Sequence, residues 1–328
     1  MMNSRNLILF ALVWVQALAI LACSIASTPG ADSQITPLHT TGIDQVGREA
    51  KIPTNAVKMS PETDEQPPRV LSDEFESPVP VPGSVNTAGG EDSPFILPDG
   101  NTLYFFFTPN VNELIEKQIK EGVTGIYVSK MVAGSWGEPE RIILQEPGKL
   151  AMDRCAFVAG DIMWFCTVRE GYTVIQWFTA EFMDGKWQNW KIVEFNPDYK
   201  VGELHLTSDG NELYFHSARP GGKGQLDIWV MKKSTGIWQE PVNVSAVNTR
   251  GSEGWPALNP QGDELWFTRN EAIWRSKKVN GEWQIADLIV SPSAREPSID
   301  SAGNLYFTHY FSIDGRMIEE DIYVAYKK

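Results

Sequence analysis

Cationic side chains are scarce in this sequence, and their scarcity excludes one class of partner. The 328 residues include 28 Lys and Arg against 42 Asp and Glu, which gives a formal net charge of −14 at pH 7. A protein that grips the phosphates of a nucleic acid needs a basic stripe, and none is visible in the sequence. We therefore expect no nucleic acid partner, and we attribute the acidity to solubility.

Enzyme signatures are missing as well. The sequence contains no G-x-S-x-G elbow, no H-E-x-x-H zinc motif, no P-loop and no G-x-G-x-x-G that opens a helix. These absences leave carboxylates as the side chains on which an enzymatic activity would depend.

The apolar run at the N-terminus is short for a membrane span. Residues 7–22 form a run of 16 residues interrupted by Gln16, whereas a spanning helix needs about 20. The run ends Ala22-Cys23-Ser24, which looks like a bacterial lipobox, where signal peptidase cuts before the cysteine and the thiol carries a lipid. We predict a lipoprotein signal peptide over residues 1–22 and lipidation of Cys23, with an ordinary signal peptide or an uncleaved anchor as alternatives. In each case the mature chain works outside the cytoplasm, in the periplasm or at the cell surface.

Residues 23–70 are predicted to form a disordered tether. They are rich in Ser, Thr, Pro, Asp and Gln, with few aromatic residues and no sustained period, so they cannot bury enough surface to offset the cost of ordering. We expect the membrane to be contacted through the lipid alone and the folded domain to comprise residues 71–328.

The folded domain repeats one pattern about every 50 residues. Residues 202–231 contain three short strands, joined by an Asp209-Gly210 turn and a glycine-rich break. Turn glycines followed by an apolar and aromatic strand recur at Gly100, Gly160, Gly210, Gly262 and Gly303. A longer echo relates VNTAGGE at 85–91 to VNTRGSE at 247–253. Five units of four short strands predict an all-β, five-bladed β-propeller.

The two ends of the chain are out of phase with this repeat. An aromatic-proline strand at Phe75 precedes the first hairpin, and the last hairpin, which ends at residues 321–324, has no fourth strand after it. We therefore predict that residues 75–87 supply the outer strand of the last blade, which would remove an open sheet edge. Residues 111–122 are predicted to be a helical insertion in the first blade.

One unit resembles a known repeat. TSDGNELYF at 207–215 followed by SARPGGKGQLDIWV at 217–230 resembles the WD40-like PD40 repeat of TolB-type β-propellers. The other units match this pattern in pieces. The resemblance implies a binding propeller, and because TolB-like propellers usually have six blades, six blades are the alternative to five.

Carboxylates recur near the start of each unit. Seven residues before the turn glycine stand Asp153, Glu203 and Glu296, and two residues earlier in the other two units stand Glu91 and Glu253. Inner strands line the channel of a propeller, so we predict these five acids as channel-lining ligand-binding candidates. They could hold a channel-bound cation, or they could serve the fold by bonding backbone amides. No other cofactor is predicted.

Two pairs of residues flank the turn glycine at equal offsets. Because the turn at Gly160-Asp161 has two residues, Cys155 and Cys166 are predicted to be direct cross-strand neighbours. A disulfide is then feasible outside the cytoplasm, and two small buried hydrophobic residues are the alternative.

The second pair consists of His205 and His216. With Glu203 two residues from His205 on the same strand face, the three are weak candidates for a metal site. Ordinary packing or hydrogen bonding between blades is the alternative.

These observations predict a monomeric, lipid-anchored, extracytoplasmic propeller that binds a protein, a saccharide or another small molecule without catalysis. The alternative hypothesis comes from a looser resemblance to five-bladed propellers of the glycoside hydrolase kind. It implies a glycoside-active enzyme that uses Asp153, Glu203, Glu253 or Glu296.

The lipobox generates the first testable prediction. Cys23→Ala should release the protein from membranes into the soluble extracytoplasmic fraction, because a diacylated cysteine supplies the two chains needed for stable attachment. Membrane and soluble fractions after a carbonate wash would measure the change, with Ser27→Ala as a matched control. Retention of the Cys23→Ala protein in the membrane pellet would show that the anchor is a different one.

Overall fold

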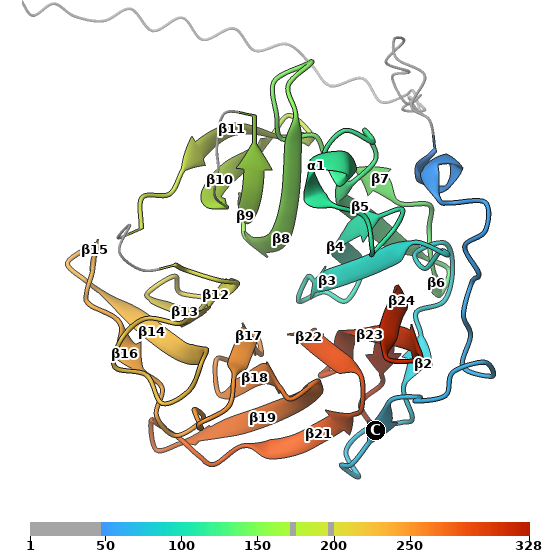
Figure 1. Cartoon of the computed structure of the whole chain (residues 1–328). Helices are drawn as coiled ribbons and strands as arrows, with labels where there is room; N and C mark the ends of the chain where they lie inside the picture. The colour runs from blue at the N-terminus through green and yellow to red at the C-terminus, as the bar shows by residue number, and fades with distance from the viewer. Residues whose placement is uncertain (1–46, 171–174, 196–199) are drawn as a thin grey trace, which may run out of the picture. The chain divides into compact units, whose positions relative to one another are not determined.

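The computed structural model describes residues 47–170, 175–195 and 200–328, and the structural statements below concern these residues. They form β-strands joined by tight turns, with two short helices, η1 (Arg48–Lys51) and α1 (Ile115–Gln118). Strand pairing gives four sheets, of which the nine-stranded one contains two antiparallel units, so that five units lie around a common centre, one for each turn glycine counted in the sequence (Figure 1). We number these units blades 1 to 5 along the chain. The predicted all-β propeller class is confirmed.

Each blade starts with an inner strand, and its later strands lie progressively farther from the centre (Figure 1). Blade 1 contains β3 (Gly90–Ile96), β4 (Thr102–Thr108), β5 (Gly125–Val132) and β7 (Glu140–Arg141). Blade 2 contains β8 (Ala151–Ala159), β9 (Ile162–Arg169), β10 (Gln176–Met183) and β11 (Lys186–Ile192). Blade 3 contains β12 (Leu204–Leu206), β13 (Glu212–Ser217), β14 (Asp227–Ser234) and β16 (Val242–Asn243).

Blade 4 contains β17 (Glu253–Leu258), β18 (Glu264–Arg269), β19 (Ala272–Val279) and β21 (Asp287–Ser291), with β1 (Arg69–Val70) added at its outer edge. Blade 5 contains β22 (Ala294–Ile299), β23 (Leu305–Ile313), β24 (Arg316–Ala325) and β2 (Val79–Pro80). The short strands β6 (Ser135–Trp136), β15 (Ile237–Trp238) and β20 (Glu282–Trp283) pair with β5, β14 and β19. A parallel pairing of Glu320 with Gly90 joins blades 5 and 1.

The second strand of a blade is apolar on both faces rather than alternating. Residues 213–215 in β13, 265–267 in β18 and 305–307 in β23 are all buried. Their side chains belong to hydrophobic clusters that extend from one blade to the next. A sheet covered on both sides excludes water from both faces, so its central strand has no solvent side on which polar residues would be favoured.

Blade 5 closes with a strand from the other end of the chain. Val79 and Pro80 of β2 pair with Val324 and Tyr323 of β24, and Phe75 forms an isolated bridge to Lys327. This is the closure predicted for residues 75–87, and it covers the edge that β24 would otherwise expose. The predicted insertion at 111–122 is helical only over the four residues of α1.

Residues 47–80, which we call the strap, contact three blades. Arg48 forms a buried ion pair with Glu91 of blade 1, and Lys58 pairs with Glu319 and Asp321 of blade 5. Further along, β1 joins the edge of blade 4 and β2 completes blade 5. The predicted tether extended to residue 70, so the boundary in the structure differs from the prediction. The reason is that polar strap residues are matched by buried partners of opposite charge, which composition cannot reveal.

The predicted signal peptide, Cys23 and the first part of the predicted tether lie outside the described residues. Within the described residues, no helix has the length and apolar character to cross a membrane.

The strap generates the second prediction. Arg48→Met should lower the free energy of unfolding by about 3 kcal/mol, because it leaves Glu91 buried without its cation. Urea unfolding would measure the loss, and Arg69→Met, at an exposed strap position, should change the midpoint little. Equal midpoints for the two variants would mean that Arg48 does not fasten the strap.

Candidate functional site

A cavity of about 50 Å³ lies where the five inner strands converge. Each inner strand contributes three consecutive residues to its wall. These triplets are residues 93–95, 155–157, 203–205, 255–257 and 296–298. The cavity is therefore built from one structurally equivalent position in every blade.

A β-bulge in four of the five strands sets this position. Register shifts interrupt the pairing of β3, β8, β17 and β22 with their neighbours. The first residue of each bulge has a left-handed backbone, with φ of 51° at Ser93, 57° at Cys155, 52° at Trp255 and 58° at Glu296. Such a conformation is unfavourable for these residue types and is typical of functional or packing constraints. A bulge re-aims a side chain, and here each first residue reaches the cavity wall.

The equivalence corrects the predicted register of one acid. In blade 2 the position equivalent to Glu203 and Glu296 is occupied by Cys155 and not by Asp153. Asp153 lies before the bulge, where it pairs with Thr167. The cause is turn length: β8 and β9 are joined by a two-residue turn between Ala159 and Ile162, whereas the turns of the other blades are longer. Counting back from the turn glycine therefore misplaced blade 2 by two residues.

Asp153 instead belongs with Glu91 and Glu253, and each of these acids binds an arginine. The nitrogen to oxygen distances are 3.1 Å for Arg48–Glu91, 3.5 Å for Arg169–Asp153 and 2.7 Å for Arg269–Glu253. The same guanidinium groups donate to backbone carbonyls of the segments that connect consecutive blades, at Val85, Leu144 and Val247. They also lie over aromatic rings, at 5.1 Å from the Phe107 centroid, 4.4 Å from Phe178 and 4.5 Å from Trp274. We call this repeated arrangement the arginine clasp.

The clasp explains the sequence echo between residues 85–91 and 247–253. Glu91 accepts hydrogen bonds from the amide and the hydroxyl of Thr87, at 2.9 and 2.6 Å. Glu253 accepts the same two bonds from Thr249, at 3.0 and 2.6 Å. These acids are fully buried and bound by the fold, so they do not face the channel as predicted.

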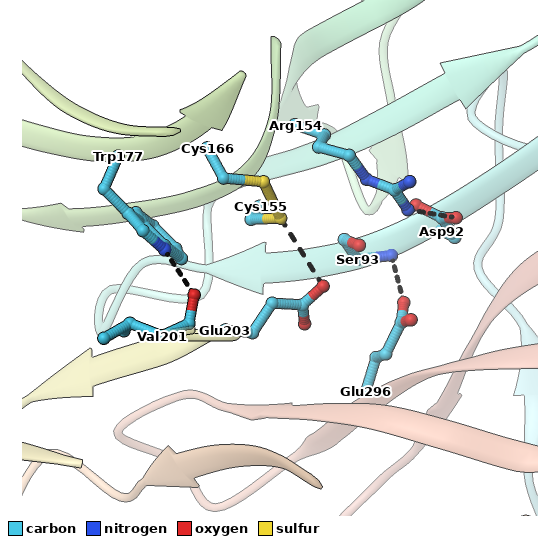
Figure 2. The surroundings of a disulfide bond; sticks show 9 residues. All are labelled: Asp92, Ser93, Arg154, Cys155, Cys166, Trp177, Val201, Glu203 and Glu296. Carbon is cyan, nitrogen blue, oxygen red and sulfur yellow. Dashed lines mark hydrogen bonds and ion pairs between the residues drawn. A yellow bond between two sulfur atoms is a disulfide. The ribbon is translucent and has the colours of Figure 1, made fainter. Parts of the chain in front are cut away.

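Cys155 and Cys166 form a disulfide, with their Cα atoms 5.5 Å apart. The predicted direct register is not observed, since Cys166 pairs with Arg154 and Cys155 lies in the bulge. The bulge brings the Cys155 sulfur to the cavity wall. There it lies 3.5 Å from Glu203 Oε1 of the next blade (Figure 2).

The two histidines occupy different environments. His205 pairs with Tyr214 rather than His216 and packs 4.5 Å from the Phe157 ring, and burial lowers its pKa to about 3. His216 accepts a hydrogen bond at Nδ1 from the amide of Trp255, at 3.1 Å, and burial lowers its pKa to about 4. In the described parts of the chain no group of three His, Cys, Asp or Glu residues has the arrangement of a metal site. The structure therefore does not bring Glu203, His205 and His216 together as metal ligands.

Glu203 and Glu296 are the predicted acids that reach the cavity. Glu296 accepts hydrogen bonds at Oε2 from the amide of Ser93, at 2.6 Å, and from the hydroxyl of Thr308, at 3.1 Å. Glu203 accepts a hydrogen bond from the side chain of Trp255. In Figure 2 the carboxyl group of Glu203 points toward the disulfide and that of Glu296 toward Ser93.

Asp92 and Arg154 complete the electrostatics of the site. Arg154 lies 3.4 Å from Asp92 and interacts with Glu203 and Glu296 as well. Burial, reinforced by the neighbouring Glu296, raises the pKa of Glu203 well above its ordinary value. The same causes raise the pKa of Asp92 to about 6. The cluster can therefore hold a proton near neutral pH or exchange it for another cation.

Sequence reasoning missed Asp92, Arg154 and the role of Ser93, although a signal was present. Ser93-Pro94, Trp255-Pro256 and Glu296-Pro297 carry proline at the second bulge position. If the units had been aligned on these prolines instead of on the turn glycines, the register of the inner strand in three of the five blades would not have depended on turn length. It would also have singled out Asp92 and Arg295, which directly precede two of these bulges, but not Arg154, whose blade has Ala156 in place of the proline.

Comparisons with known proteins add no functional argument. No model of a protein family matches the sequence, and no curated protein matches it. Similar solved structures include a protein of unknown function from Dyadobacter fermentans, with 12% identity, covering 80% of this chain and 100% of that one at a TM-score of 0.47. A putative TolB from Agrobacterium tumefaciens has 14% identity, with 81% and 91% covered at 0.44. A gluconolactonase from Xanthomonas campestris has 12% identity, with 83% and 98% covered at 0.47.

The shifted pKa values generate the third prediction, a fall in stability from pH 6.5 to pH 8. Buried acids with raised pKa values, such as Glu91 at about 7 and Glu203, hold protons in the folded chain that the unfolded chain has lost. Their contribution to stability is therefore lost as pH rises through the folded pKa, by roughly 1 kcal/mol over this interval for Glu91, whose folded pKa is about 7. Below pH 6.5 the buried His205 and His216 lower the stability of the folded chain. Their pKa values are lower in the folded than in the unfolded chain, so the unfolded chain binds protons at these histidines at higher pH.

Urea midpoints at pH 6.5 and 8.0 would measure this effect. Glu203→Gln should reduce the difference between the two midpoints. Asp209→Asn should not, because hydrogen bonds from Thr207 and Asn211 lower the pKa of Asp209 to about 2 and it stays ionised throughout. A wild-type midpoint that is higher at pH 8.0 would contradict the assignment of protons to the buried acids.

Proposed function

We propose that this chain is a lipid-anchored, extracytoplasmic β-propeller that binds a protein or a small-molecule ligand and catalyses no reaction. The observation that carries the proposal is the use that the fold makes of its carboxylates. Glu91, Asp153 and Glu253 are held in arginine clasps, and Glu296 bonds the Ser93 amide across the seam between blades 5 and 1. Acids bound in this way stabilise the fold through these ion pairs and hydrogen bonds, and a catalytic acid or nucleophile would have to break them in order to react.

The size of the cavity supports the same proposal. One benzene molecule fits in an engineered protein cavity of about 150 Å³. The cavity of the propeller is smaller, at about 50 Å³. A sugar ring with its hydroxyl groups and an attacking water needs more room than benzene. The cavity volume is therefore smaller than a glycoside and its attacking water require.

Three features support a location outside the cytoplasm. The Cys155–Cys166 disulfide is of a kind that persists in oxidising compartments. The lipobox at Cys23 and the resemblance of residues 207–230 to TolB-type repeats point in the same direction.

One observation favours the alternative, a glycoside-active enzyme. A general acid needs a raised pKa, and burial with the neighbouring Glu296 raises that of Glu203. The same shift follows from burying two carboxylates side by side in any protein, so it does not by itself indicate catalysis.

The fourth prediction separates the two functions. Glu203→Gln and Glu296→Gln should each change the urea midpoint without removing any glycosidase activity, because none is expected in the parent. For Glu296→Gln we expect a loss of roughly 1–2 kcal/mol, since the amide keeps one acceptor but loses the charge-assisted part of its bonds. A screen of aryl glycosides would measure activity, with Glu76→Gln, at an exposed position, as the control. Turnover by the parent that either cavity substitution abolishes, while Glu76→Gln retains it, would establish the enzyme instead.

A further inference from the structure

The acids around the cavity outnumber the cations that face them. Asp92, Glu203 and Glu296 act together on Arg154, and Arg295, which also acts on Asp92, is paired with Glu320. One guanidinium group thus balances three carboxylates. An unbalanced carboxylate inside a protein is unfavourable by several kcal/mol unless a proton or another cation accompanies it.

Hydrogen-bond acceptors at the cavity also lack donors. Ser93 lines the cavity and is 8% exposed. Its hydroxyl group is buried and has no hydrogen-bond partner among the described residues. Both hydrogen bonds of Glu296 use Oε2, which leaves Oε1 as an acceptor. Glu203 Oε1 faces the Cys155 sulfur, which carries no proton in the disulfide.

We propose that this cavity binds a primary ammonium group. Three acceptors, on Ser93, Glu203 and Glu296, surround the space, and an ammonium group presents three N–H donors. Its positive charge offsets one of the unbalanced carboxylates. Trp255 forms part of the wall, and aromatic rings are favourable neighbours for cations.

The chemistry of the wall favours an ammonium group over other cations. In the described residues no three His, Cys, Asp or Glu side chains are arranged to hold a metal ion, so chelation has few protein ligands. A guanidinium group has five donors in a rigid plane, more than the three acceptors identified here. A cavity of about 50 Å³ has room for a small ammonium group, since about 10–15 Å³ of such space holds one water molecule.

The inference rests on the proposed binding function and names the chemical class of its ligand. A primary ammonium group occurs on small free amines and at the tip of a lysine side chain. Both sources share the chemistry that the cavity recognises, and probes can distinguish them.

The fifth prediction tests this site by thermal unfolding of the full chain at pH 7.5 with increasing methylammonium chloride. We expect a saturable rise in the melting temperature, with at least tenfold weaker apparent affinity in Glu203→Gln and no change in Glu76→Gln. Tetramethylammonium, which has the charge but no N–H donor, should have no effect at equal ionic strength. Calorimetry in two buffers should show proton release on binding, because the cation replaces the proton that burial and the neighbouring Glu296 favour on Glu203.

The source is identified by a second probe, Nα-acetyl-lysine methylamide. If both this probe and methylammonium bind when tested separately, the site is supported and its ligand is a lysine of a partner protein. If methylammonium binds and this probe does not, the site is supported for free amines. The proposal is overturned if no saturable shift occurs, if Glu203→Gln binds as well as the parent, or if only calcium chloride raises the melting temperature. Glycoside turnover is measured separately. If the protein hydrolyses glycosides and also binds methylammonium, the proposed function is refuted and the ammonium site is still supported.

Discussion

The arginine clasp is the interaction on which the rest of the structure depends. In blades 1, 2 and 4 an arginine pairs with a buried carboxylate of the inner strand, and the same arginine binds the connecting segment and covers an aromatic ring. Blades 2 and 4 supply this arginine from their own second strands, as Arg169 and Arg269. Blade 1 receives it from the strap, as Arg48. The strap is therefore part of the propeller, because without it Glu91 would remain a buried charge without a partner.

The clasp also determines which acids are available for function. It binds Glu91, Asp153 and Glu253, which stand before the bulge and are not among the residues of the cavity wall. The bulge then turns the chain by one residue and presents a different side chain to the centre, which is Cys155 in blade 2 and Glu296 in blade 5. The clasp position and the cavity position thus stand only two residues apart in sequence and differ completely in their surroundings.

This proximity explains what the sequence could and could not predict. The hairpins, the repeat and the pairing of β2 with β24 were predictable, because turn glycines and aromatic strands are local signals. The strap was not, since Arg48 lies 43 residues from Glu91 and Lys58 lies 261 residues from Glu319, and a polar segment carries no local sign of distant partners. The register of Asp153 was mispredicted because one short turn displaced the count, and the bulge of blade 2 has Ala156 where three other bulges have a proline that marks them in the sequence.

Glu203 and Glu296 remain as acids that no arginine clasp neutralises. Replacing both with apolar residues would remove a desolvation cost of several kcal/mol, and the stability of the blades gives no reason to keep Glu203, whose hydrogen bond is to a single indole. Glu296 differs, because it joins two blades through the Ser93 amide. A buried acid that the fold does not need, placed beside an acceptor without a donor, is what a binding site for a small cation requires. The physical case for a ligand in the channel therefore rests on Glu203 more than on any other residue of the cavity.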